Sequence, residues 1–124
     1  MSASGSYDIA IYEVSKSSGA ITLDAQNSMY NSTTSLTPSG QSLSLSGSDD
    51  ACFQQIFADG APTGAGAGAV TLYTYPSGQD LNEFNSGTFG DATAALLNTN
   101  NGSAPIWQIT STATKSIVSG VCFQ

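Results

Sequence analysis

Residues 51–57 read Ala-Cys-Phe-Gln-Gln-Ile-Phe, a nearly continuous run of apolar and β-forming residues in a chain of 124 residues. Its length and its content of Phe and Ile predict a strand over Cys52–Phe57 that is covered on both faces. A further strand is expected over residues 115–123, near the end of the sequence. Each of these two segments carries one of the only two cysteines of the chain, so the fold is expected to depend on both.

The two cysteines, Cys52 and Cys122, both have apolar neighbours. If they form a disulfide, the bond closes a long loop and stabilises the fold by about 4 kcal/mol in the chain-entropy model. It would fasten the end of the chain to its middle. The alternative is a pair of buried, reduced thiols in a cytosolic protein. We expect the disulfide.

The rest of the apolar pattern is short, has a period of two and is interrupted by Gly, Ser and Asn, which is typical of an all-β protein. Asp91 is a good helix N-cap, and the helix-forming residues after it predict a short helix over residues 91–98. We therefore expect one domain over residues 1–124, an antiparallel Greek-key β-sandwich with one short helix. Its further strands are expected over residues 7–14, 20–23, 41–47, 70–75 and 106–110.

The composition excludes several functions. The chain has no histidine and two lysines, more than a quarter of its residues are Ser or Thr, and its net charge is −7. A Ser nucleophile lacks its usual base, and the common zinc ligand sets cannot be assembled. A net negative charge repels a phosphate backbone, so we expect no nucleic-acid partner. No run approaches the ~20 apolar residues of a membrane span.

Two glycosylation sequons begin at Asn31 and Asn101, in polar stretches that indicate loops. Together with the expected disulfide and the scarcity of Lys and Arg, they favour an extracellular, secreted protein. No leader is expected within residues 1–6, because they have no hydrophobic core.

The chain shows a weak internal repeat on either side of the low-complexity residues 61–69. Tyr12-Glu13 followed by Gly19 has a counterpart in Tyr73 followed by Gly78, each after a β-forming run. These residues resemble the βγ-crystallin-like family, which implies two Greek-key halves, at about residues 5–60 and 69–124. The second spacing is two residues shorter than the family's pattern.

The same resemblance implies a calcium site at Asp49 and Asp50, which match the acidic pair of the family's motif. Phe53 and Gln54 stand where the family has two hydroxyl residues, and the second half keeps only Ser116 of the motif. Calcium prefers six to eight oxygen ligands, and an adjacent acidic pair supplies some of them. The alternative interpretation is a turn before the strand that begins near Cys52.

A second set of candidates combines aromatic rings with carboxylates. Asp80 and Glu83 are expected in a loop close in sequence to Tyr73 and Tyr75. Such a group can bind a sugar by stacking and hydrogen bonding, or hydrolyse a glycoside if its carboxylates are suitably spaced. It can equally be a soluble hairpin above an aromatic core. Trp107 is expected in that core.

These observations lead to one main hypothesis and two alternatives. We expect a non-enzymatic secreted protein that binds at a cell wall, matrix or host surface, with a glycan or a cell-surface protein as partner and no cofactor. The first alternative is a calcium-binding βγ-crystallin-like domain. The second is a small glycosidase that uses Asp80 or Glu83.

Overall fold

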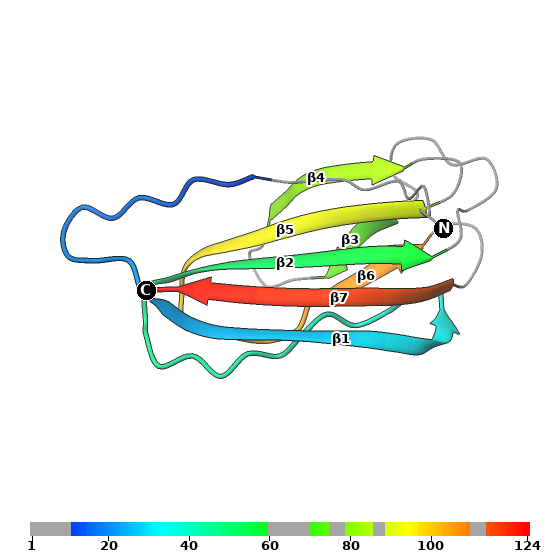
Figure 1. The fold of residues 1–124 in the computed structure, drawn as a ribbon, viewed down its shortest axis with the longest axis horizontal. Coiled ribbons are helices and arrows are strands. Elements are labelled where there is room, and N and C mark those ends of the chain that lie inside the picture. The colour runs from blue at the N-terminus through cyan, green and yellow to red at the C-terminus, as the bar shows by residue number, and fades with distance from the viewer. Residues whose placement is uncertain (1–10, 60–69, 75–78, 86–88, 110–113) are drawn as a thin grey trace, which may run out of the picture.

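The computed structural model describes residues 11–59, 70–74, 79–85, 89–109 and 114–124, and the strands in this part of the chain form two antiparallel sheets. The five-stranded sheet has the order β1-β7-β2-β5-β4, and β3 pairs with β6 in a two-stranded sheet behind it (Figure 1). The prediction of an all-β antiparallel fold is confirmed. The strands are β1 (Leu23–Ser35), β2 (Asp50–Asp59), β3 (Val70–Thr74), β4 (Gln79–Asn85), β5 (Phe89–Thr99), β6 (Ile106–Ile109) and β7 (Thr114–Phe123).

The pairing of β2 with β7 places the two cysteines opposite each other. Cys52 is the register partner of Cys122, their Cα atoms are 4.1 Å apart, and the two residues form a disulfide. Both are almost completely buried. The predicted disulfide is confirmed, and it links two strands in the middle of the sheet that are far apart in the sequence.

The core lies between the two sheets, on what we call the inner face of the five-stranded sheet. Alternate residues of β2 point into it, including Ile56, which is fully buried and lies opposite Val118 of β7. Trp107 and Ile109 of β6 belong to the same cluster of buried residues. The expected core position of Trp107 is therefore confirmed.

Residues 36–45 extend the second layer beside β6 without forming a regular strand. Backbone amides of Gly40 and Leu43 donate to the carbonyl oxygens of Pro105 and Gly102, at 2.8 and 2.7 Å. The side chain of Gln54 in β2 reaches across the core and bonds both the N–H and the C=O of Gln41, at 3.2 and 2.7 Å. An added Cβ at residue 120 would come within 2.7 Å of the Gln54 amide, which explains a glycine in the middle of β7.

The predicted strand over residues 41–47 is wrong, because the backbone of this segment does not form continuous strand pairing. Its alternation is real, since Leu43 is buried and Leu45 is half-buried. The backbone, however, bonds only intermittently to the loop before β6 and through a side chain to β2. Alternating burial marks a segment that lies against a core, and it does not by itself require a ladder.

The predicted helix over residues 91–98 is also wrong, because these residues lie within β5. Ala92, Ala94 and Leu96 face the core on the inner face, while Thr93 and Ala95 are buried on the opposite face. A strand that is buried on both faces has a continuous apolar sequence, and periodicity cannot distinguish it from a short buried helix. The described residues contain no helix.

Two further strands were not expected from the sequence. Residues 24–35 form most of β1, so the sequon at Asn31 lies in a strand and not in a loop. Asp80 and Glu83 lie in β4, where a loop was predicted. The predicted strand over residues 7–14 is wrong for residues 11–14, and its first part lies outside the described residues. Residues 20–22 precede β1, although Thr22 forms two backbone bonds with Gln124.

Candidate binding groove

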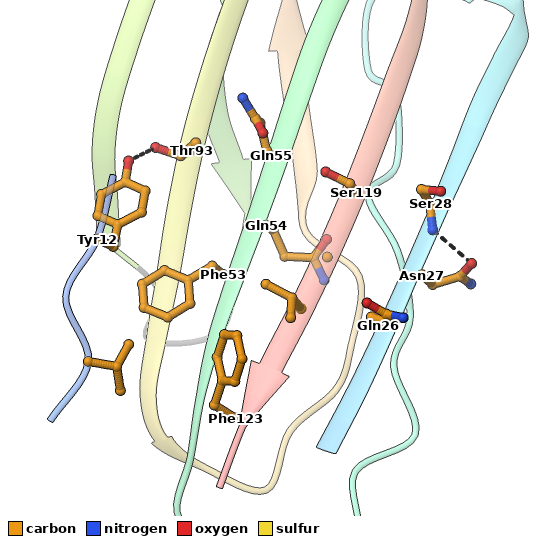
Figure 2. Close-up of a pocket in the computed structure, with 13 residues that line it drawn as sticks. Tyr12, Gln26, Asn27, Ser28, Phe53, Gln54, Gln55, Thr93, Ser119 and Phe123 are labelled. Atoms are coloured by element: carbon orange, nitrogen blue, oxygen red, sulfur yellow. Dashed lines mark hydrogen bonds between the residues drawn. The ribbon is translucent and has the colours of Figure 1, made fainter. Parts of the chain in front are cut away.

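A groove of about 640 Å³ runs over the outer face of the five-stranded sheet, the face turned away from the core. Strand pairing arranges its side chains in rows that cross β1, β7, β2 and β5. One row is Gln26, Val121, Phe53 and Ala95; the next is Ser28, Ser119, Gln55 and Thr93. Figure 2 shows the side chains of these rows that line the groove, among them Gln26, Phe53, Gln55 and Ser119.

The second of these rows, which we call the polar row, consists only of hydroxyl and amide side chains. Its four residues are register partners across four neighbouring strands, so the row spans roughly 14 Å. A further row beside it has the apolar residues Tyr30 and Ile117, both exposed, and Phe57, half-buried, and ends at the buried Asp91 of β5. The polar row thus lies between two rows that carry aromatic or aliphatic side chains.

An aromatic pair forms one wall of the groove. The rings of Tyr12 and Phe53 stack with centroids 5.4 Å apart and planes at 17°. The Tyr12 hydroxyl is hydrogen-bonded to the Thr93 hydroxyl, so the segment before β1 is fixed over the outer face of β5 (Figure 2). This contact covers Thr93 and helps explain why β5 is buried on both faces.

No residue that lines this groove carries a charge, although the chain as a whole has a net charge of −7. A neighbouring groove of about 710 Å³ differs in this respect. It shares Tyr12, Phe53 and Phe123 with the first groove but includes Glu13 and Lys16 at its margin. The first groove therefore offers uncharged hydrogen-bonding groups beside apolar rings.

The predicted calcium residues have different surroundings. Asp49 is exposed, whereas Asp50 is fully buried and neither of its carboxylate oxygens has a hydrogen-bond donor among the described residues. The group beside Asp50 is the carboxylate of Asp24, which accepts hydrogen bonds from the Ser46 N–H at 2.7 Å and from the Ser46 hydroxyl. Within the described ranges no three His, Cys, Asp or Glu residues are grouped to hold a metal ion. Calcium binding at Asp49 and Asp50 stays a prediction.

The two neighbouring carboxyl groups have opposite pKa shifts. Burial, followed by the proximity of Asp24, raises the pKa of Asp50 above its ordinary value of 3.8. Hydrogen bonds from Ser46 lower the pKa of Asp24. Asp50 is therefore the carboxyl group of this pair that takes up a proton first as the pH falls.

We expect Asp50→Asn to raise the free energy of unfolding at pH 7 by about 1–3 kcal/mol, because it removes a buried carboxylate that has no donor. In the parent protein the folded state binds a proton on Asp50 at a pH where the unfolded state does not. Its stability should therefore increase as the pH falls from neutral towards 4, and the Asn variant should lack this increase. Below that range, protonation of Asp24 removes stability.

Urea unfolding at a series of pH values measures both effects. Asp49→Asn is the matched control, since it removes an adjacent but exposed carboxylate and should change the stability little. Equal effects of the two substitutions would contradict the conclusion that the buried carboxylate of Asp50 lowers the stability of the folded protein.

The other predicted site residues are not among those that line this groove. Tyr73 is in β3 of the two-stranded sheet, and Asp80 and Glu83 are in β4, at the edge of the five-stranded sheet opposite β1. The register shift in β4 gives Asp80 and Glu83 the partners Ala94 and Ala92. Tyr75 and the side chains of the other three lie outside the part of the chain that the structure describes, so a site formed by them stays a prediction.

The two sequons have different environments. The Asn31 amide donates to the Ser116 hydroxyl at 3.0 Å, and the residue is half-buried in β1. Asn101 lies in the loop before β6, as predicted, and its side-chain oxygen accepts from the Ser103 N–H at 2.9 Å. Their modification was not tested and stays a prediction.

Sequence reasoning missed the residues of the groove because they come from five separate segments. A signal was present in the alternation of Phe53 and Gln55 in β2, which puts a ring and an amide on the same face two residues apart. The same alternation occurs at Ser119 and Val121 in β7. Comparison with protein-family models, with curated proteins and with solved structures finds no match for this chain.

Proposed function

We propose that this protein is a non-enzymatic, secreted binding protein that holds a neutral glycan in the groove on its outer face. The observation that carries the proposal is the uncharged lining, in which the polar row lies directly beside the Tyr12–Phe53 ring pair. A sugar has apolar C–H faces and a rim of hydroxyl groups. Aromatic rings stack on the C–H faces, and amide and hydroxyl side chains form hydrogen bonds with the hydroxyl groups of the sugar.

The shape of the groove supports a chain of sugars more than a single sugar. The three accessible residues of the polar row, Ser28, Ser119 and Gln55, cross three strands, which is roughly 10 Å, and Tyr12 lies over the fourth residue, Thr93. An acidic polysaccharide would be repelled by the net charge of −7 and would find no cation in the lining. We therefore propose an uncharged oligosaccharide or polysaccharide as the ligand.

The proposal is for binding without catalysis. The groove lining contains no Asp, Glu or Lys that could serve as an acid, base or nucleophile.

The buried disulfide fits an oxidising compartment, which supports secretion. We also propose that the two sheets form a Greek-key β-sandwich. No helix of the described residues has the length and apolarity to cross a membrane.

The proposal predicts that Phe53→Ala weakens glycan binding by about tenfold or more. Loss of a stacked ring costs about 0.5–1.5 kcal/mol beyond the area that it buries, and 1.4 kcal/mol corresponds to tenfold. The experiment is an array of neutral and acidic oligosaccharides, followed by calorimetry of the best ligand with the parent and with Phe53→Ala.

Leu36→Ala is the matched control, because Leu36 is an exposed apolar residue outside the groove. It should leave affinity unchanged, and Gln55→Ala should weaken it without loss of fold. Far-ultraviolet circular dichroism and thermal unfolding verify that each variant is folded. Binding of acidic glycans alone, or equal affinity of the parent and Phe53→Ala, would refute the proposal.

A further inference from the structure

The two edges of the five-stranded sheet are protected to different degrees. At one edge, β4 has seven residues, includes Asp80 and Glu83, and has an irregular register with β5. Short length, charge and irregular register are the usual means by which an edge strand avoids pairing with another chain. The β4 edge has the charges and the irregular register, and it is shorter than β1.

The other edge, β1, is long, and its middle part has neither charged residues nor an irregular register. β1 is 13 residues long, and its sequence contains no charged residue and no proline from Ala25 to Ser35. Its register with β7 is regular from Ala25 to Asn31, and the irregularities fall at either end. Residues 26–30 are all exposed, and Met29 and Tyr30 are 45% and 55% exposed.

No described segment pairs with the free side of this regular stretch. Residues 36–45 run below β1 in Figure 1, but their backbone bonds go to residues 102–109 of the second layer. Another described segment bonds only the start of β1, between Asp24 and Ser46. In the middle, the Ser28 N–H donates to the side-chain oxygen of Asn27 at 2.8 Å, and pairing with another strand replaces this local bond. The outward backbone groups of residues 25–31 therefore present a flat, uncharged edge.

We propose that two copies of this chain pair through their β1 strands, antiparallel, with Ser28 of one copy opposite Ser28 of the other. This register uses the whole regular stretch, since Ala25 then lies opposite Asn31 and Gln26 opposite Tyr30. It brings no two carboxylates together, because Asp24 lies opposite Ser32. A protein with a net charge of −7 can associate with itself at this edge and not at β4.

The pairing closes on itself, because a two-fold contact uses the β1 edge of both copies. On the outer face it brings the two polar rows end to end at Ser28. A row that crosses four strands in one copy then continues across four strands of the second, and two grooves share one surface. The partner is thus a second copy of this chain, joined by backbone hydrogen bonds.

Sedimentation of the parent over a series of concentrations tests this directly, and we expect a reversible monomer–dimer equilibrium. Ser28 faces its own copy at the two-fold axis, so Ser28→Lys and Ser28→Asp each place like charges opposite each other. The dimer dissociation constant of each variant alone should be higher than that of the parent, by up to about fivefold. Mixing the two should restore association as a heterodimer. Leu97→Lys, an exposed residue of β5, is the control and should leave dimerisation unchanged.

Hydrogen exchange of the parent gives a second measurement that needs no variant. Amides of residues 25–31 should be better protected at high than at low protein concentration, and those of β4 should not change. A parent that stays monomeric, or a mixture that associates no better than its components, would overturn the proposal. So would protection that increases in β4 instead.

Discussion

Replacing both Cys52 and Cys122 by alanine is expected to lower the free energy of unfolding by about 4 kcal/mol. The disulfide joins residues 70 positions apart, so it restricts the unfolded chain strongly. It also fills the inner face between β2 and β7, where both residues are almost completely buried. Native domains are stable by about 5–15 kcal/mol, so the variant should lie near the limit of folding.

Urea unfolding of the oxidised parent, the reduced parent and the double alanine variant measures this effect. The reduced parent should lose most of the same stability, because its cysteines still fill the core but no longer link the strands. An unfolding free energy that reduction leaves unchanged would show that the bond does not stabilise the folded state. The comparison separates the covalent constraint from the packing of the two side chains.

Trp107→Ala should cost about 3–5 kcal/mol, the range for removal of a large aromatic side chain from a core. Trp107 is fully buried in β6 and belongs to the cluster formed by the inner face of the sheet. Its backbone N–H donates to Pro38 at 3.0 Å, so the residue also fixes residues 36–45 against β6. The alanine variant leaves a cavity between the two sheets.

Trp107→Phe is the matched variant and should cost clearly less. The indole Nε1 of Trp107 has no hydrogen-bond partner among the described residues, so phenylalanine keeps a ring and removes an unsatisfied donor. Because Trp107 is the single tryptophan of the chain, circular dichroism has to follow the unfolding of both variants. Equal costs for Ala and Phe would show that the ring does not fill the core.

The sequence predicted the strands whose own residues are strongly β-forming, although β2, expected to be covered on both faces, is only half-buried on its outer face at Phe53, Gln55 and Phe57. β2 and β7 combine β-forming residues with the two cysteines, and the disulfide followed from them. β3 and β6 were likewise expected at nearly their observed bounds. These segments carry enough apolar residues to show a strand locally.

The parts that could not be predicted adopt their structure because of contacts with segments that are distant in the sequence. β1 is stable because β7 lies beside it, although its sequence is almost wholly polar. β5 lacked the period of two because Tyr12 and its neighbours cover the face that would otherwise be polar. The groove depends on which strands are adjacent, and the order β1-β7-β2-β5 is not encoded in any one segment.

The position of β7 between β1 and β2 has a consequence for biosynthesis. β1 pairs with β7, and β2 pairs with both β7 and β5; β7 is synthesised more than fifty residues after β2 begins. Until β7 has been made, β2 can pair only with β5, and β1 and Cys52 both lack the partners that β7 supplies. The complete five-stranded sheet can therefore form only late in translation, and until then β1 and one edge of β2 are unpaired and prone to aggregation.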